Sequence, residues 1–248
     1  MRPMSSQPWY VEAFTADYLD VYPHRDELGA TREIQAVLGY LSFDREHHRL
    51  LDLASGAGRH SLALRAEQCH VTCLDLSADL TLRSREAGLD TVRADMRKLP
   101  FADGSFDAVT MLFSSFGYFD DDADHQATLC DIARVLAPGG SLFLDLMDRD
   151  TVSSNLVPEG TERRDDMVIE VQRSMTVGNR RVEKTIAMTR PGGSPRRWLE
   201  SVRLFTGEEI NALAAGAGLA VAGTWGDYEG GPHVAGQSRR LVLLRKPS

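Results

Sequence analysis

The chain has 248 residues, of which 42% are hydrophobic and 26% are charged, a balance typical of a folded globular protein. Its formal net charge of −8 argues against a polyanionic partner such as bulk RNA or DNA. No stretch approaches the roughly 20 apolar residues that cross a bilayer, and the first residues lack the apolar core of a signal peptide. Three cysteines are too few for a disulfide framework or a zinc site. We therefore expect a cytoplasmic protein with no membrane segment, no nucleic-acid partner and no metal.

Residues 1–44 are predicted to form N-terminal cap helices. The pattern is helical from about residue 9 to residue 43, and aromatic side chains are interspersed along it. Such a face is typical of an amphipathic helix packed on a domain. The tyrosines and Arg25 also offer hydroxyl and guanidinium donors for a bound carboxylate or for a substrate, and both roles are compatible.

A glycine loop follows the first predicted strand. The apolar run Leu50–Leu53 contains Asp52, then Gly56 and Gly58 form a Gly-x-Gly turn, and a helix begins at once. Glycines tolerate positive φ and let the backbone approach a ligand closely, and a helix start favours an anionic or polar group. A dinucleotide fingerprint would carry a third glycine where this chain has Ser61. The loop therefore predicts a nucleotide-like ligand but not a pyrophosphate.

Two more acids end the next two predicted strands. Asp75 ends the second strand, where a carboxylate suits ribose hydroxyls. Asp95 ends a short third strand and is placed to accept a hydrogen bond from an adenine amino group, while the polarisable thioether of Met96 suits a ring face. Either acid alone is more often a turn or capping residue, so the prediction rests on their order.

This order resembles class I S-adenosylmethionine-dependent methyltransferases of the small-molecule type, similar to sugar-amine N-methyltransferases. The resemblance covers residues 45–150, including a fourth strand at 106–113 and the Leu-x-Pro-Gly-Gly element at 136–140. It implies an α/β fold with a Rossmann-like, doubly wound, mostly parallel sheet of about seven strands and an antiparallel last strand. It also implies S-adenosylmethionine as cofactor and S-adenosylhomocysteine as product.

The pattern changes after residue 150. Strands are predicted at 167–177 and 181–190, which flank a hairpin signal at Gly178, and again at 196–205. They predict an inserted antiparallel lid sheet, which also offers a surface for a homodimer. A capping box at Thr206 opens a helix, and two strands then complete the core.

The chain is therefore expected to divide into four parts. These are cap helices at 1–44, the cofactor-binding core at 45–150, the lid at 151–205, and a helix with strands completing the core at 206–248. Residues 1–150 carry the negative charge, whereas 151–248 are slightly basic, which fits either solvated hairpins or a small anionic substrate.

The resemblance and the loop chemistry together define a predicted cofactor site. Arg59 and His60, in the first turn of the next helix, are expected to pack or cap instead. The expected cofactor-binding residues are Tyr18, Arg25, Asp52, Ala54, Ser55, Gly56, Gly58, Asp75, Leu76, Asp95, Met96, Arg97, Leu112 and Phe113.

The segment leaving the fourth strand is the expected acceptor region, because ligands of open α/β sheets bind at the carboxyl ends of the strands. Tyr118 and His233 are the predicted catalytic residues, with His125 and the loop at Asp227 as alternative sources of a base. The expected substrate contacts are Tyr10, Tyr22, Ser115, Phe116, Tyr118, Trp225 and Tyr228.

The acceptor itself stays open at this stage. An amine nitrogen is favoured, because a neutral amine needs no strong base and aromatic faces attract a cationic substrate. The alternatives are O- or C-methylation of a small metabolite, an RNA methyltransferase of the same fold, and a nicotinamide-dependent oxidoreductase. The acidic charge disfavours RNA, and Ser61 together with Asp95 disfavours nicotinamide.

Overall fold

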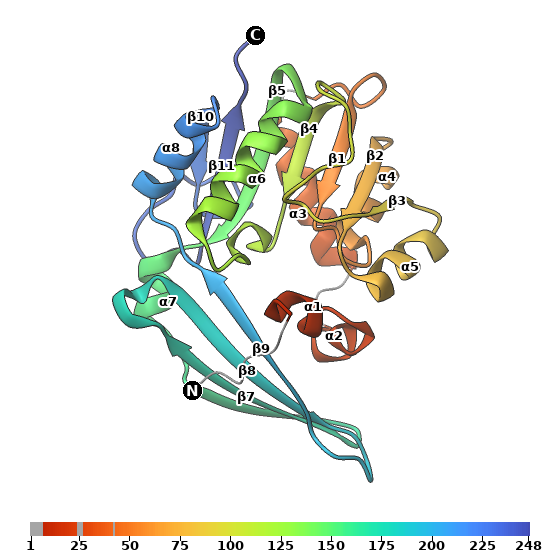
Figure 1. The fold of residues 1–248 in the computed structure, drawn as a ribbon, viewed down its shortest axis with the longest axis vertical. Coiled ribbons are helices and arrows are strands. Elements are labelled where there is room, and N and C mark those ends of the chain that lie inside the picture. Colours follow the sequence, from red (N-terminus) through yellow and green to blue (C-terminus); the bar gives the residue numbers. More distant parts are fainter. Residues whose placement is uncertain (1–6, 24–26, 42) are drawn as a thin grey trace.

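The computed structural model describes residues 7–23, 27–41 and 43–248, which fold around a seven-stranded sheet (Figure 1). In order across the sheet the strands are β10 (Ala220–Trp225), β11 (Arg239–Arg245), β5 (Leu136–Met147), β4 (Phe106–Met111), β1 (Arg49–Leu53), β2 (His70–Asp75) and β3 (Asp90–Arg93). Neighbours from β5 to β3 are parallel, whereas β11 runs antiparallel to both β5 and β10. The predicted mostly parallel sheet with an antiparallel last strand is confirmed.

Helices cover both faces of this sheet. They are α3 (Glu27–Tyr40), α4 (Arg59–Ala66), α5 (Ala78–Glu86), α6 (Asp122–Val135) and α8 (Gly207–Gly216). Leu50 packs in one core with Ile34 of α3 and Leu64 of α4, whereas its neighbour Leu51 packs in a second core with Leu129 of α6. Since successive side chains of a strand point to opposite faces, β1 is a central strand buried on both sides.

A second, four-stranded antiparallel sheet follows α7 (Arg149–Ser154). Its strands, in order, are β6 (Glu159–Arg164), β7 (Met167–Met175), β8 (Arg181–Thr189) and β9 (Arg196–Arg203). We call it the lid sheet. Sequence analysis predicts β7, β8 and β9 but neither β6 nor α7. In β6 nearly every side chain is exposed, so the alternation that marks a half-buried strand is absent there.

Two short helices, α1 (Trp9–Ala13) and α2 (Ala16–Val21), lie between the seven-stranded sheet and the lid sheet (Figure 1). We call residues 9–22 the roof. Trp9 and Tyr22 of the roof are buried against the lid-sheet side chains Ile186 and Trp198. The predicted helical stretch therefore consists of α1, α2 and α3 in the described part of the chain.

The Leu-x-Pro-Gly-Gly element differs from its prediction in detail. Helix α6 ends at Val135, as expected, but residues 136–140 already belong to β5. The register between β4 and β5 shifts in this stretch, between Phe106 and Ala108, which absorbs the extra residues.

Within the described residues, no helix is long and apolar enough to cross a membrane. The division of the chain into four parts stays a prediction, as does the homodimer through the lid sheet.

Candidate cofactor and acceptor site

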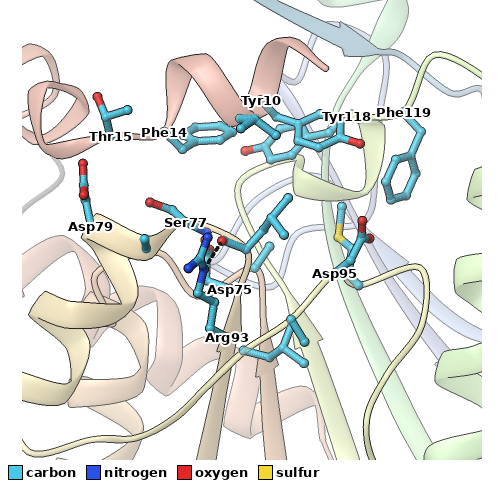
Figure 2. Close-up of a pocket in the computed structure, with 17 residues that line it drawn as sticks. Tyr10, Phe14, Thr15, Asp75, Ser77, Asp79, Arg93, Asp95, Tyr118 and Phe119 are labelled. Atoms are coloured by element: carbon cyan, nitrogen blue, oxygen red, sulfur yellow. Dashed lines mark hydrogen bonds between the residues drawn. The ribbon is translucent and has the colours of Figure 1, made fainter. Parts of the chain in front are cut away.

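Two adjoining cavities lie where β1, β2 and β3 end, beneath the roof. Cavity 1 has a volume of about 280 Å³ and cavity 2 of about 150 Å³, and Phe14, Asp75 and Tyr118 are among the residues that line both. Figure 2 shows Tyr10, Phe14 and Tyr118 along one side of cavity 1, with Asp75 and Asp95 on the opposite side. The carboxylates at the strand ends therefore face aromatic rings across a space of ligand size.

Asp52 joins β1 to α4 and β4 through its carboxylate. It is fully buried, and its two carboxylate oxygens accept hydrogen bonds from Ser61 Oγ at 2.5 Å and from Thr110 Oγ1 at 3.1 Å. Burial raises the pKa of Asp52, although the nearby His60 and these hydrogen bonds oppose the shift. Ser61, at the position of the third glycine of a dinucleotide fingerprint, is thus a hydrogen-bond donor to this carboxylate.

Asp75 is oriented by the backbone rather than by side chains. Its Oδ2 accepts a hydrogen bond from the Gly56 amide at 2.7 Å, and its Oδ1 accepts one from the Ser77 amide at 2.8 Å. Burial raises its pKa, and these amide hydrogen bonds work in the opposite direction. The carboxylate is therefore fixed between the glycine loop and the start of α5, with both cavities beside it.

Asp95 is held by Arg97, not by the backbone alone. The Arg97 guanidinium donates to Asp95 Oδ2 at 2.7 Å and to Asp124 Oδ2 at 3.1 Å. Burial works to raise the pKa of Asp95, but the hydrogen bonds from Arg97 outweigh it and the pKa is lowered. Asp95 lines cavity 1, whereas Arg97 lines neither cavity. Arg97 therefore supports Asp95 from behind.

The glycine loop presents polar groups to which a bound ligand could form hydrogen bonds. Ser55 Oγ is buried beside cavity 2 and has no hydrogen-bond partner among the described residues. Helix α4 begins directly after the loop without a side-chain cap, so the amides of its first turn favour a negative group. Gly58 at this start has φ of 87°, and a Cβ there would lie 2.4 Å from Leu89, so its role is close packing.

Most of the predicted site residues meet at the two cavities. Those lining cavity 1, cavity 2 or both are Tyr10, Tyr18, Tyr22, Asp52, Ala54, Ser55, Gly56, Asp75, Leu76, Asp95, Met96, Leu112, Phe113 and Tyr118. Arg25 lies outside the described residues.

The segment after β4 divides between cavity and core. Ser115 and Phe116, predicted to contact substrate, line neither cavity: Ser115 Oγ donates to the Leu112 carbonyl at 3.0 Å, and Phe116 is fully buried. His125 is also fully buried, with its ring centroid 5.3 Å from that of Phe116 and 5.1 Å from that of Phe205. Burial lowers the pKa of His125 to about 4, so it is a neutral core side chain rather than a base at the site.

The C-terminal candidates also lie elsewhere. Trp225 stacks on Tyr40 with ring centroids 4.1 Å apart, and the Tyr228 hydroxyl donates to Asp145 Oδ2 at 2.9 Å. Burial, reinforced by the charge of Asp145, raises the pKa of Tyr228 well above its usual value. Neither side chain lines a cavity, because β5 and α3 supply partners that draw both rings into the core.

His233, predicted to be catalytic, pairs with Asp148 instead. Its Nε2 lies 3.0 Å from Asp148 Oδ2, the atom that also accepts from Arg240 at 3.1 Å. His233 lines a separate open groove beside α8 and β10, not cavity 1 or cavity 2.

Several residues that line the cavities are not predicted from the sequence. Phe14 lines both cavities, and Arg59 and His60, expected to pack or cap, line cavity 2. The four-residue spacing of Phe14, Tyr18 and Tyr22 was the available signal, since it places the three rings on one side of a helical segment.

Comparison with known proteins agrees with this geometry. The family described as "Methyltransferase domain" matches residues 50–140. The cypemycin N-terminal methyltransferase of a Streptomyces species is 32% identical over 208 residues, which cover 79% of this chain and 82% of that protein.

Two solved structures share the whole fold. The CcbJ methyltransferase from Streptomyces caelestis superposes with a TM-score of 0.82 at 17% identity, covering 96% of this chain and 98% of that one. The sugar N-methyltransferase KedS8 from a Streptoalloteichus species superposes with a TM-score of 0.75 at 20% identity, over 100% of both chains. The extent of the sequence match, the shared fold and the carboxylate-lined cavities together show that the chain belongs to the class I S-adenosylmethionine-dependent methyltransferases.

Proposed function

We propose that this protein transfers the methyl group of S-adenosylmethionine to an amine nitrogen of a small molecule. The cofactor, when bound, supplies a methyl group that its positive sulfonium activates for in-line displacement, so the protein mainly aligns the reactants and excludes water. We assign cavity 1 to the adenosine part, and cavity 2 to the methionine tail and the acceptor.

The assignment of cavity 1 rests on its two carboxylates. Asp75 keeps acceptor capacity beyond its two amide hydrogen bonds, which suits the ribose hydroxyls. Asp95, kept ionised by Arg97, suits the adenine amino group, and Leu76 and Met96 add apolar contacts for the ring.

The observation that carries the amine proposal is the state of the titratable groups in cavity 2. Asp52 accepts from two hydroxyls, Asp75 accepts from two amides, and His60 Nε2 lies 2.7 Å from Glu33. Among the described residues that line cavity 2, Asp52 and His60 therefore already have partners, and the acceptor capacity that Asp75 keeps is assigned to the ribose. A hydroxyl acceptor needs a general base near the methyl group, whereas a neutral amine attacks with its own lone pair.

An aromatic wall supports the same acceptor. Phe14 has its ring centroid 5.0 Å from that of Tyr18 and 5.1 Å from that of Tyr118, and Tyr18 and Tyr22 are 4.9 Å apart. Such faces attract the positive charge that develops on nitrogen during the transfer, typically by about 0.5–2 kcal/mol. We assign Tyr118, which lines both cavities, to aligning the acceptor. The name of the sugar N-methyltransferase KedS8 points to nitrogen as well.

The test measures methyl transfer from S-adenosylmethionine by mass spectrometry against matched acceptor pairs. Each pair differs only at the acceptor atom: an amino sugar and its hydroxy counterpart, and a short peptide with a free or an acetylated amino terminus. We expect product only from members that carry a free amine. Methylation of the hydroxy members alone would overturn the proposal.

Substitution of Tyr118 tests the alignment role. We expect Tyr118→Ala to lower kcat/KM for the amine about tenfold, corresponding to about 1.4 kcal/mol. Tyr118→Phe keeps the ring and should stay within about threefold of the wild type. An equal loss in both variants would assign the effect to the hydroxyl and contradict the role of the ring.

A further inference from the structure

Arg59 is the one lysine or arginine among the described residues that line cavity 2. It is the first residue of α4, so it directly follows the loop at Gly56 and Gly58. Its side chain is 20% exposed. A positive charge therefore stands at the helix start, where the α4 amides already favour a negative group.

The guanidinium of Arg59 is held in place on two sides. Its Cζ lies 4.3 Å from the centroid of the Phe113 ring, and Nη2 lies 3.2 Å from Glu33 Oε2. The same Glu33 oxygen lies 2.7 Å from His60 Nε2. Burial works to raise the pKa of Glu33, but the hydrogen bond with His60 and the charges of His60 and Arg59 lower it, so Glu33 is a carboxylate.

A second guanidinium beside the same ring has a different environment. Arg239 Cζ lies 4.4 Å from the Phe113 centroid, but its Nη1 donates to both oxygens of the fully buried Asp145, at 2.8 and 2.7 Å. Arg239 thus donates twice to a buried carboxylate and lines neither cavity, whereas Arg59 lines cavity 2. Of the two guanidiniums beside Phe113, Arg59 is therefore the one placed at the cavity.

The backbone is strained where it supports this arrangement. Phe113 has φ of 55° and Ser114 has φ of 61°, two successive non-glycine residues in the left-handed region. Such a conformation costs about 1–2 kcal/mol per residue. Asp145 maintains it, because its Oδ2 accepts from the Phe113 amide at 3.0 Å and its carbonyl from the Ser114 amide at 2.8 Å. This backbone carries the Phe113 ring that lies 4.3 Å from Arg59 Cζ.

We propose that Arg59 binds the carboxylate of the methionine tail of S-adenosylmethionine. A planar guanidinium matches a carboxylate through two parallel hydrogen bonds, and the stack on Phe113 orders it before the ligand arrives. The hydroxyl of Ser55, buried beside the same cavity without a partner among the described residues, adds a donor. This role depends on the cofactor and not on the identity of the acceptor.

The test compares two ligands by titration calorimetry with the full-length protein. S-adenosylhomocysteine carries the amino-acid tail, whereas 5′-methylthioadenosine lacks it. We expect Arg59→Met to weaken S-adenosylhomocysteine binding about 10- to 100-fold, as for loss of charge-assisted hydrogen bonds, and to leave 5′-methylthioadenosine binding within about twofold. Arg59→Lys, which keeps the charge but loses the planar fork, should fall between Arg59→Met and wild type.

Two matched variants complete the design. Arg65→Met alters an arginine of the same helix that donates to the carbonyls of Ala87 and Gly88, outside both cavities, and should bind both ligands as the wild type does. Arg25→Met tests the arginine that the sequence suggested. An equal loss of both ligands in Arg59→Met, or a selective loss in Arg25→Met with none in Arg59→Met, would overturn the proposal. No acceptor is needed, so the outcome is separate from that of the amine test.

Discussion

The three strand-end carboxylates differ in what holds them, and this decides what each can do. Asp52 is bonded by two hydroxyls below the loop, Asp75 by two backbone amides, and Asp95 by the guanidinium of Arg97. Burial raises the pKa of Asp52 and Asp75, whereas Arg97 lowers that of Asp95. Of three similar positions in the sequence, Asp52 thus joins β1 to α4 and β4, whereas Asp75 and Asp95 are the residues that we assign to ribose and adenine.

A substitution at Asp75 tests the ribose assignment. Because hydrogen bonds to a charged group contribute about 1.5–3 kcal/mol, Asp75→Ala should weaken S-adenosylhomocysteine binding roughly 10- to 100-fold in calorimetry. Asp90→Ala is the control, since Asp90 accepts a hydrogen bond from Thr72 on the next strand and lines neither cavity. Equal affinity of the Asp75 variant and wild type would rule the assignment out.

At the scale of elements, the roof is attached to both bodies that it lies between. On the core side, Asp79 Oδ2 of α5 accepts from the Ala16 amide at 3.1 Å, at the start of α2. On the lid side, Asp17 of α2 pairs with Arg190 at 2.6 Å and with Arg196. Cavity 1 is therefore covered by helices whose position depends partly on charge pairs.

We expect Asp17→Asn to loosen this cover. Pairs of this exposure contribute up to about 1 kcal/mol each, so dissociation of S-adenosylhomocysteine should accelerate several-fold, and added salt should act in the same direction on the wild type. Stopped-flow tryptophan fluorescence measures the rate, since Trp9 lies in the roof and Trp198 packs in the same cluster. Asp150→Asn, which removes a surface pair with Arg149, should leave it unchanged. A dissociation rate unaffected by Asp17→Asn would mean that apolar packing alone holds the roof.

At the scale of the whole molecule, the lid sheet is joined to the core beside a buried histidine. Arg203 of β9 contacts Asp122 at 3.2 Å and Glu209 at 2.6 Å, and Arg181 of β8 donates to the Phe119 carbonyl at 2.6 Å. His125 lies within this junction, fully buried, and its ring nitrogens have no hydrogen-bond partner among the described residues. The junction is therefore intolerant of a charge on that ring.

This arrangement predicts a loss of stability in mild acid. The pKa of His125 is lowered to about 4 by burial, which Arg181 and Arg203 reinforce and Asp122 opposes, so the unfolded chain binds this proton more readily than the folded one. The stability that the neutral His125 ring contributes is complete above pH 6.5. It is lost as the pH falls toward 4, which lowers the free energy of unfolding by about 3 kcal/mol. Urea unfolding between pH 4 and 7 measures it.

A matched pair of variants isolates the histidine from the carboxylates that also titrate. His125→Leu should flatten the pH dependence over this range, whereas His47→Leu should not, because His47 is exposed beside Asp44. Parallel pH profiles for His125→Leu and the wild type would contradict the prediction.

The features that the sequence predicts correctly are local. The glycine loop, the capping box at Thr206 and the strands that end in acids each depend on residues a few positions apart, because turn chemistry and burial period are short-range. Strand β6 escaped prediction because its exposed side chains carry no such period. The site followed the same rule in part: Ser55 and Gly56 of the loop line cavity 2, whereas Gly58 lines neither cavity.

By itself, then, the sequence determined the sheet, the nucleotide-like loop and the order of acids that identifies the cofactor. The tertiary structure decided which distant side chains complete the site. Phe14 and Tyr118 meet on one side of the cavities because the roof folds back over the strand ends. Tyr228 and His233 are drawn away because Asp145 and Asp148 of the β5 region accept their hydrogen bonds. A hydrogen bond between segments far apart in the chain depends on packing, and no local pattern encodes it.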